Sequence, residues 1–283
     1  MKQRIITALI IAPLTIAGVF LLPLNLFMLF AAVIFLLASK EWGAFVSKVK
    51  PLTVFYLFAI LLCASVFMLP VENIWINGTV NPFIYWCLMV AAIWWVISLI
   101  MVISYPKTAP FWSSNWTIKS IMGVLTLLPF FFGMVLLRSI NIDTNFYFGA
   151  ELLLFVFMLV WAADTGAYFC GKRFGKNKLA INVSPGKTIE GFIGGLLLAM
   201  IVAYLGTVFF AVASDKIFVF LVSSFVTICV SALGDLNESI FKREAGLKDS
   251  GNLLPGHGGI LDRIDSLTAA VPVFAIFYLI WLN

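Results

Sequence analysis

Long apolar runs separated by short polar breaks extend along almost the whole chain. A helix needs about 20 mainly apolar residues to cross a bilayer, within a range of about 17–25. Measured against that length, the pattern predicts nine membrane-spanning helices and an all-α integral membrane protein. The predicted spans are residues 5–22, 24–39, 52–69, 82–104, 118–137, 148–164, 189–213, 217–235 and 266–282. We interpret the first as an uncleaved span, because no signal-peptide cleavage pattern follows it.

Composition supports the bilayer as the solvent. The chain is 63% hydrophobic and only 11% charged, whereas a soluble domain averages about 25% charged residues. With one histidine and no paired cysteines, the sequence offers no His/Cys zinc set. We expect the lipid bilayer as a partner and no nucleic acid.

The basic residues predict the orientation. If the N-terminus is cytoplasmic, 16 of the 18 basic residues fall in inside segments, and only Arg138 and Lys216 lie outside. This asymmetry is the one that the positive-inside rule describes. The C-terminus is then on the opposite side. We predict an N-terminal region of about five spans (1–147) and a C-terminal region of about four spans (148–283), which carries two cytoplasmic polar segments at 164–195 and 231–266.

The first polar segment combines glycines, basic residues and a carboxylate. Asp164 ends an apolar run, where a carboxylate is costly unless it is paired, solvated or bound to a cation. Gly186-Lys187-Thr188 resembles the end of a P-loop, but Ile181 stands where its first glycine is required and no strand precedes it. Glycine backbone and Lys187 still favour an anion site. Ser184 before Pro185 predicts the start of a helix.

Two interpretations of the first segment remain open. In one, its five basic residues form a juxtamembrane patch that holds anionic lipid. In the other, the segment binds substrate. The candidate substrate-binding residues are Asp164, Ser184, Lys187, Thr188 and Glu190.

The second polar segment contains six acids interleaved with basic residues. Asp235, Glu238 and Lys242 share one face if the eighth span continues as a helix. Asp262 and Asp265 stand at the beginning of the last span. Carboxylates at two converging helix ends suit a hard cation such as Mg²⁺.

The glycine-rich loop at 255–259 precedes the last span and contains His257, the only histidine. Its backbone could let an anion approach closely, and we expect His257 to contact a phosphate. The alternative for the whole segment is a cytoplasmic loop carrying surface ion pairs.

Both segments resemble the phosphatidate cytidylyltransferase family, also called CDP-diacylglycerol synthases. The motif of that family is matched at every defining position: Ser239, Lys242-Arg243, Lys248-Asp249, Pro255, His257-Gly258-Gly259, Asp262-Arg263 and Asp265. The 164–195 segment is similar to the companion block of the family, with Ile181 where proline is expected.

The resemblance implies transfer of CMP from CTP to phosphatidate at the cytoplasmic face of a bacterial inner membrane. It implies Mg²⁺ or another divalent cation, leaves a second cation open, and leaves a homodimer open. Asp235 and Asp262 are the expected metal ligands, with Asp249 as a further candidate. The expected catalytic residues are Lys187, Lys242, Arg243, Lys248, Asp249, His257 and Arg263. Ser239, Gly258 and Gly259 join the substrate-binding set. The rivals are a CTP-dependent lipid kinase, a cytidylyltransferase for another lipid phosphate, and a transporter.

Overall fold

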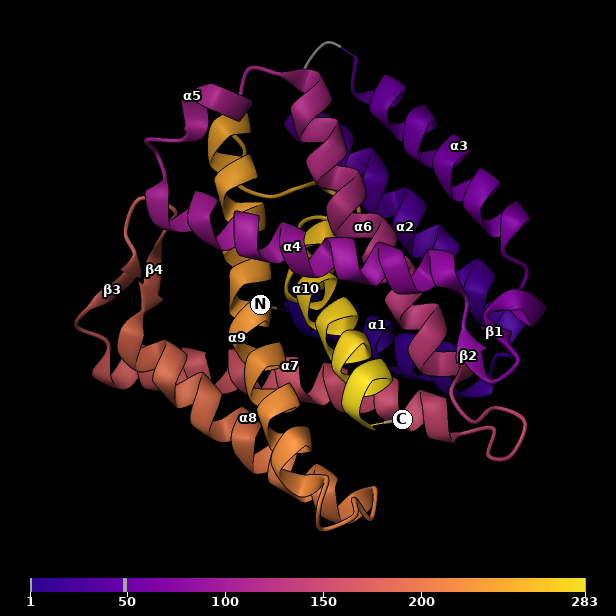
Figure 1. The fold of residues 1–283 in the computed structure, drawn as a ribbon. Coiled ribbons are helices and arrows are strands. Elements are labelled where there is room, and N and C mark those ends of the chain that lie inside the picture. The colour runs from indigo at the N-terminus through magenta and orange to yellow at the C-terminus, as the bar shows by residue number, and fades with distance from the viewer. Residues whose placement is uncertain (1, 48–49, 283) are drawn as a thin grey trace.

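The computed structural model describes residues 2–47 and 50–282. Long helices form at every predicted span (Figure 1). In the described part they are α1 (Lys2–Leu21), α2 (Leu24–Val46), α3 (Pro51–Met68), α4 (Pro82–Ser104), α6 (Trp116–Ser139), α7 (Phe148–Phe174), α8 (Ile189–Phe209), α9 (Ile217–Ala245) and α10 (Leu261–Phe277). Eight of the described helices are long and apolar enough to cross a membrane, and α1 adds a shorter apolar stretch, Leu9–Leu21. The prediction of an all-α integral membrane protein is confirmed.

The remaining elements are short. They are the helical turns η1 (Val71–Asn73), α5 (Ala109–Trp112) and η2 (Tyr278–Leu282), and the strands β1 (Trp75–Ile76), β2 (Thr79–Val80), β3 (Lys178–Ala180) and β4 (Ser184–Thr188). Each pair of strands forms a small antiparallel hairpin.

The predicted helix start at Ser184-Pro185 is wrong. Ser184 pairs with Ala180 in the second hairpin, and α8 begins only at Ile189. A proline is tolerated there because a two-stranded hairpin has an open edge, so the missing N–H need not remove a ladder bond. Thr188 begins α8 instead: its hydroxyl oxygen accepts a hydrogen bond from the Gly191 N–H at 3.1 Å.

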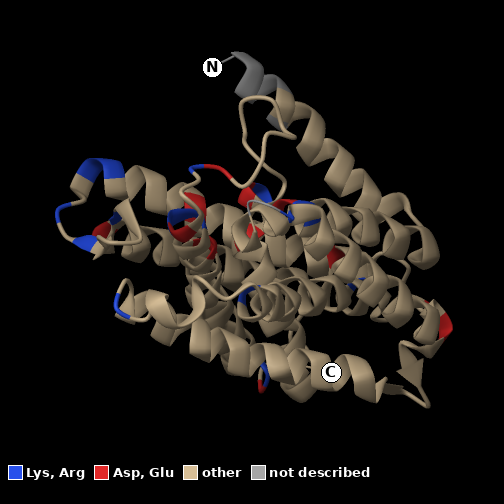
Figure 2. Cartoon of the chain, turned by 90° about the horizontal axis from the view of Figure 1, so that it is seen from above, with Lys and Arg blue, Asp and Glu red and all other residues tan. Residues whose placement is uncertain are grey.

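Several helices extend beyond their apolar runs, and the extensions carry the polar motifs. The α7 helix continues past residue 164 to Phe174, α9 continues past 235 to Ala245, and α2 continues past 39 to Val46. At the other end of the chain, α10 begins at Leu261 rather than at 266. Most of the ribbon is free of charge, and the charged residues are gathered in a few places (Figure 2).

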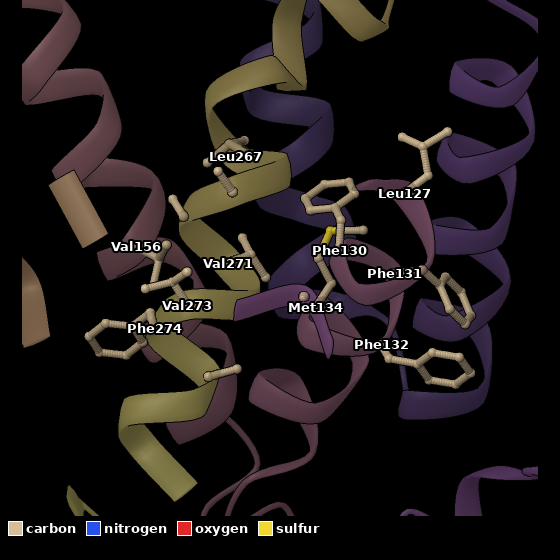
Figure 3. Close-up of a cluster of buried hydrophobic side chains, with 14 of the residues drawn as sticks. Leu127, Phe130, Phe131, Phe132, Met134, Val156, Leu267, Val271, Val273 and Phe274 are labelled. Atoms are coloured by element: carbon tan, nitrogen blue, oxygen red, sulfur yellow. The ribbon is translucent and has the colours of Figure 1, made fainter. Parts of the chain in front are cut away.

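The buried core lies around α10, which packs against α6, α7 and α9. Side chains of α6 and α10 fill the space between these helices (Figure 3). A Cβ on Gly133 would lie 3.1 Å from Val271 and 3.2 Å from the Pro272 backbone, so α6 approaches α10 closely there. Small residues at helix contacts allow such packing in membranes. Helices from both halves of the chain therefore share one core.

The loops that were predicted to be cytoplasmic meet at one end of the bundle. The Thr7 hydroxyl donates to the Pro255 carbonyl at 3.1 Å. The Tyr105 hydroxyl, just after α4, donates to Glu244 Oε1 at 2.9 Å. Burial and this bond raise the pKa of Tyr105 to about 12, so Tyr105 stays a donor at neutral pH. Lys48, in the predicted 40–50 loop, lies outside the described residues. The side of the membrane that this end faces stays a prediction.

Arg138 belongs to the opposite end but is not a loop residue. It lies in the last turn of α6 and is fully buried. Its guanidinium donates to the backbone carbonyls of Val19 at 2.8 Å, Phe146 at 3.0 Å and Leu22 at 3.2 Å. A guanidinium with several donors can satisfy carbonyls at helix ends inside a bilayer. Arg138 thus joins α1, α6 and the start of α7.

Candidate active site

A cavity of about 430 Å³ lies between α7, β4, α8 and α9, at the place where the two polar segments meet. Its polar wall combines Asp164 and Lys172 from α7, Lys187 and Thr188 from β4, and Asp235 from α9. The helices α7 and α8 are held close by glycines: a Cβ on Gly166 would lie 2.6 Å from the Gly194 carbonyl oxygen. The structure therefore brings three predicted substrate-binding residues and one predicted metal ligand into one cavity.

The charge pattern of this cavity is mixed. Lys187 Nζ lies 2.5 Å from Asp235 Oδ2, and both side chains are partly exposed. Asp164 lies within electrostatic reach of Asp235, Lys187 and Arg263. A phosphate group entering the cavity could contact the Lys187 ammonium in place of the Asp235 carboxylate, because both anions offer charge-assisted hydrogen bonds.

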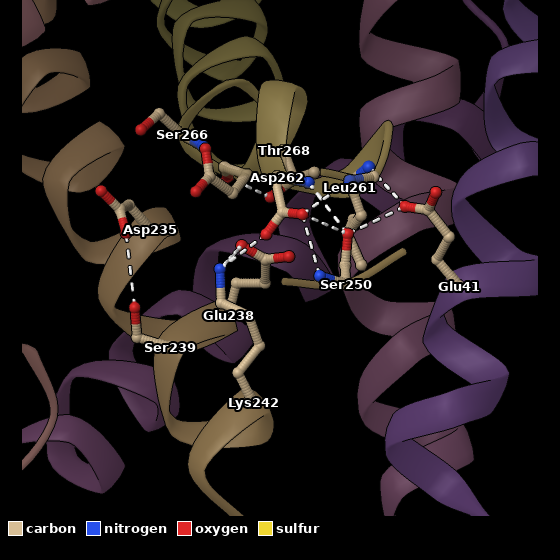
Figure 4. Close-up of polar contacts among 12 residues, drawn as sticks. Glu41, Asp235, Glu238, Ser239, Lys242, Ser250, Leu261, Asp262, Ser266 and Thr268 are labelled. Carbon is tan, nitrogen blue, oxygen red and sulfur yellow. Dashed lines mark hydrogen bonds and ion pairs between the residues drawn. The ribbon is translucent and has the colours of Figure 1, made fainter. Parts of the chain in front are cut away.

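A second polar cluster lies beside this cavity, between α9 and α10 (Figure 4). Lys242 Nζ donates to Glu238 Oε2 at 2.8 Å and to Asp262 Oδ1 at 2.8 Å. The predicted helical face of Asp235, Glu238 and Lys242 is confirmed, because α9 continues through all three. Lys242 joins the two helix ends that were expected to converge.

Asp262 also organises the loop that precedes α10. Its Oδ2 atom accepts hydrogen bonds from the Ser250 N–H at 2.8 Å, the Ser250 hydroxyl at 2.9 Å and the Gly259 N–H at 2.8 Å. Gly258 has φ +82°, and a Cβ there would lie 2.6 Å from Asp262 Oδ2. The motif glycines thus allow the loop to wrap closely around one carboxylate. Only Oδ1 of Asp262, which faces Lys242, is available to another ligand.

Asp265 was assigned no role of its own from the sequence, although it ends the matched motif. Its carboxyl group lies near those of Asp235 and Glu238. The helices are close here, because a Cβ on Gly234 of α9 would lie 2.5 Å from the Asp265 carbonyl oxygen. Oε1 of Glu238 is buried and receives no hydrogen bond from the described residues. Clustered carboxyl oxygens with one unsatisfied atom suit a hard cation.

No three His, Cys, Asp or Glu side chains of the described residues already stand close enough together to hold a metal ion. The lysines explain part of the separation between the carboxylates, because Lys187 is paired with Asp235, and Lys242 with Glu238 and Asp262. An ion bound here would therefore compete with two ammonium groups. The donor chemistry fits a divalent cation, and the ligand set remains a proposal.

Other candidate residues contact protein groups. Glu190 accepts hydrogen bonds from the backbone N–H groups of Lys176 and Asn177, at 3.1 and 3.2 Å, and from the Asn177 side chain at 2.7 Å. Arg243 Nε donates to the Val183 carbonyl at 3.1 Å. These contacts favour supporting roles for Glu190 and Arg243, since each holds part of the second hairpin in place.

The remaining candidates surround the two clusters. The Ser239 hydroxyl donates to Asp235 Oδ1 at 3.4 Å. Lys248 and Asp249 are exposed on the loop after α9, and Ser184 is half-buried on β4. Nδ1 of His257 is buried and has no hydrogen-bond partner among the described residues.

The sequence did not indicate Glu41 as a residue of the site. It lies on the extension of α2, is 8% exposed, and reaches the start of α10 from the N-terminal half (Figure 4). Its carboxylate accepts hydrogen bonds from the N–H groups of Ile260 at 3.0 Å and Leu261 at 2.8 Å, and from the Ser250 hydroxyl at 2.9 Å. The only signal in the sequence is a carboxylate two residues after the end of an apolar run, and this signal does not reveal a partner.

A mainly apolar groove of about 420 Å³ adjoins the polar cavity. It is lined by α4, α9 and the second hairpin, and Leu179, Phe192 and Ala232 line both spaces. Ile103 and Ile181 stand at its edge and are exposed, at 75% and 65%. The polar cavity therefore shares part of its wall with a space that suits hydrocarbon.

Together these features define a polytopic membrane protein with a site suited to phosphate groups and a cation. The chain belongs to the cytidylyltransferase family, whose model matches residues 2–281. It is 42% identical over 283 residues to a phosphatidate cytidylyltransferase of Haemophilus influenzae, covering 98% of each chain. It is 40% identical to the Pseudomonas aeruginosa protein of that name, over 99% of this chain and 97% of the other. A phosphatidate cytidylyltransferase of Bacillus subtilis is 42% identical over 154 residues, 53% of this chain and 56% of the other.

Proposed function

We propose that this protein transfers CMP from CTP to phosphatidate and so forms CDP-diacylglycerol and pyrophosphate. The observation that carries the proposal is that Lys187, Asp164 and Asp235 line one cavity, which shares part of its wall with a mainly apolar groove. Such a site suits a reaction between a polar nucleotide and a lipid phosphate. The names of the relatives that match nearly the whole chain agree with it.

In this reaction a phosphatidate phosphate oxygen attacks the α-phosphorus of CTP. The new P–O bond forms as the bond between the α-phosphorus and the bridging oxygen breaks, and pyrophosphate leaves with that oxygen. The nucleophile is largely ionised at neutral pH, because the second pKa of a phosphate is near 6. No general base is required, so His257 need only contact a phosphate.

The main barrier is repulsion between two anions, together with charge on the leaving group. Positioned cations reduce the repulsion between the anions and stabilise the charge on the leaving group. Lys187 in the polar cavity, Lys242 between the helices and Arg263 near Asp164 are the proposed phosphate contacts. Lys248, which is exposed on the loop after α9, and Arg243, which is bonded to the hairpin, are further proposed phosphate contacts.

A divalent cation such as Mg²⁺ would be held by Asp235 and Asp265, with Oδ1 of Asp262 and the unsatisfied oxygen of Glu238 alongside. When bound, it would neutralise phosphate charge and polarise the P–O bonds. Asp249 stays a further candidate ligand, and a second cation is left open. We also propose that the site faces the cytoplasm of a bacterial inner membrane, where cytosolic CTP can reach a bilayer lipid. A homodimer stays a hypothesis.

The proposed function is tested by the acceptor dependence of pyrophosphate release. Purified protein with Mg²⁺ and CTP should release pyrophosphate only when phosphatidate is supplied. A CTP-dependent lipid kinase would release CDP, and a cytidylyltransferase for another lipid would need that other acceptor. Pyrophosphate release that is independent of phosphatidate would contradict the proposal.

We expect the groove to receive an acyl chain of the lipid substrate. Ile103→Trp should narrow the groove from its exposed edge, and so raise KM for long-chain phosphatidate several-fold while leaving KM for dihexanoyl phosphatidate unchanged. The matched control is Ile93→Trp, at a residue of α4 that is 62% exposed and does not line the groove. Equal effects on both lipids, or equal effects of both variants, would remove the groove from substrate binding.

A further inference from the structure

We propose that Glu41 is a positioning residue, which holds the Gly258-Gly259 turn and Asp262 in the arrangement that the reaction needs. This inference rests on the proposed function and concerns a residue outside every motif of the sequence. Glu41 is separated by 209 to 220 positions from the three groups that it contacts. It is a point at which the N-terminal half reaches the start of α10.

The start of α10 has no cap of its own. Its N-cap residue is Ile260, whose side chain cannot accept a hydrogen bond. The first N–H groups of a helix lack partners within the helix and attract negative charge. The Glu41 carboxylate satisfies two of these groups, those of Ile260 and Leu261. A carboxylate from α2 therefore performs the role that a Ser, Thr, Asp or Asn at the N-cap usually performs.

Within the described residues, hydrogen bonds rather than ion pairs compensate the charge of this buried carboxylate. None of the ion pairs found among the described residues includes Glu41. A buried carboxylate is costly unless hydrogen bonds or charges compensate it. The aligned N–H groups of α10 are thus its main compensation, and the orientation of α10 and the charge on Glu41 depend on each other.

Glu41 reaches Asp262 through the Ser250 hydroxyl. This hydroxyl oxygen lies 2.9 Å from Glu41 Oε2 and 2.9 Å from Asp262 Oδ2. A hydroxyl has one proton, so it can donate to only one of these carboxylates at a time. The Gly259 N–H donates to the same Asp262 oxygen. Loss of the Glu41 oxygens would free two N–H groups and the hydroxyl, and Asp262 and its turn would shift together.

The test uses Glu41→Gln in the full-length protein. Glutamine keeps the size of the side chain but carries one NH₂ group, which would face N–H donors. Supporting residues of this kind typically cost about 10–100-fold when they are changed. We expect kcat to fall at least about tenfold, a higher half-saturating Mg²⁺ concentration, and a KM for CTP within about twofold of the wild type. Glu41→Asp keeps the charge and should recover part of kcat.

The control is Glu72→Gln, which removes an exposed carboxylate in η1 and should leave kcat and Mg²⁺ dependence unchanged. All rates are expressed per folded protein, from thermal unfolding in detergent. If Glu41→Gln does not yield folded protein, Ser250→Ala breaks the bridge to Asp262 and should change the same two quantities. If Glu41→Gln folds and its kcat and Mg²⁺ dependence are unchanged, the inference is overturned. If Ser250→Ala has to be used instead, unchanged kcat and Mg²⁺ dependence in Ser250→Ala overturn it. Absence of any product with wild-type protein would instead overturn the proposed function.

Discussion

Asp235→Asn is expected to lower turnover by at least about a hundredfold while leaving the protein folded. Asparagine keeps the size of the side chain and can still accept from Ser239, but it removes the charge from the group nearest Lys187. A cation at this position would be worth several kcal/mol of transition-state stabilisation, and about 3 kcal/mol corresponds to a hundredfold in rate. Asp265→Asn should give a similar loss, because Asp265 lies in the same cluster.

The measurement is kcat at saturating CTP and phosphatidate, across a range of Mg²⁺ concentrations. Asp215→Asn, which changes an exposed residue between α8 and α9, is the matched control and should behave like the wild type. Chelation should abolish turnover of the wild type, and added Mg²⁺ should restore it. Near wild-type turnover of Asp235→Asn would remove Asp235 from the cation site.

Gly259→Ala is expected to lower turnover by a similar factor, because it changes the geometry of the turn and leaves its charge unchanged. A Cβ at this position would overlap Ser250 Oγ and Glu41 Oε2. Neither atom can move freely, because the hydroxyl and the carboxylate are each held by several hydrogen bonds. The turn must therefore shift, and a misplacement of about 1 Å can cost a hundredfold in rate.

A useful control for this variant is Gly18→Ala in α1. There the nearest atoms are at the edge of the Phe30 ring, 3.1 Å away, and an aromatic side chain can rotate aside. We expect the control to retain full turnover. If Gly259→Ala retained turnover within about threefold of the wild type, the turn would not need the geometry described here.

Hydropathy located the spans well but ended several helices too early. It measures where a segment can contact lipid, whereas a helix continues wherever its polar side chains find partners. The extension of α9 beyond residue 235 is held by pairs such as Lys242 with Glu238 and Asp262. Glu238 is a local partner on the same helical face, but Asp262 comes from the next helix, so no window of local sequence could show that Lys242 is fully paired.

The site was only partly predictable for the same reason. The motif spacing placed Asp235 and Lys242 on one helical face, and this was confirmed. The polar segments offered Glu190 and Arg243 as substrate or phosphate contacts, whereas in the fold both are bonded to the second hairpin. Glu41 acquires its partners only when α2 packs beside the start of α10. Tertiary contacts of this kind leave no periodic signal in the chain.

The fate of labelled CTP tests the central claim most directly. Purified protein with Mg²⁺, phosphatidate and CTP labelled on the α-phosphate should move the label into lipid. With CTP labelled on the γ-phosphate, the label should stay in water as pyrophosphate, because the α-phosphorus is the atom attacked. A lipid kinase gives the reverse pattern, and a transporter moves neither label into a lipid product. Label from the γ-phosphate in lipid, or no more α-label in lipid with phosphatidate than without an acceptor, would contradict the account.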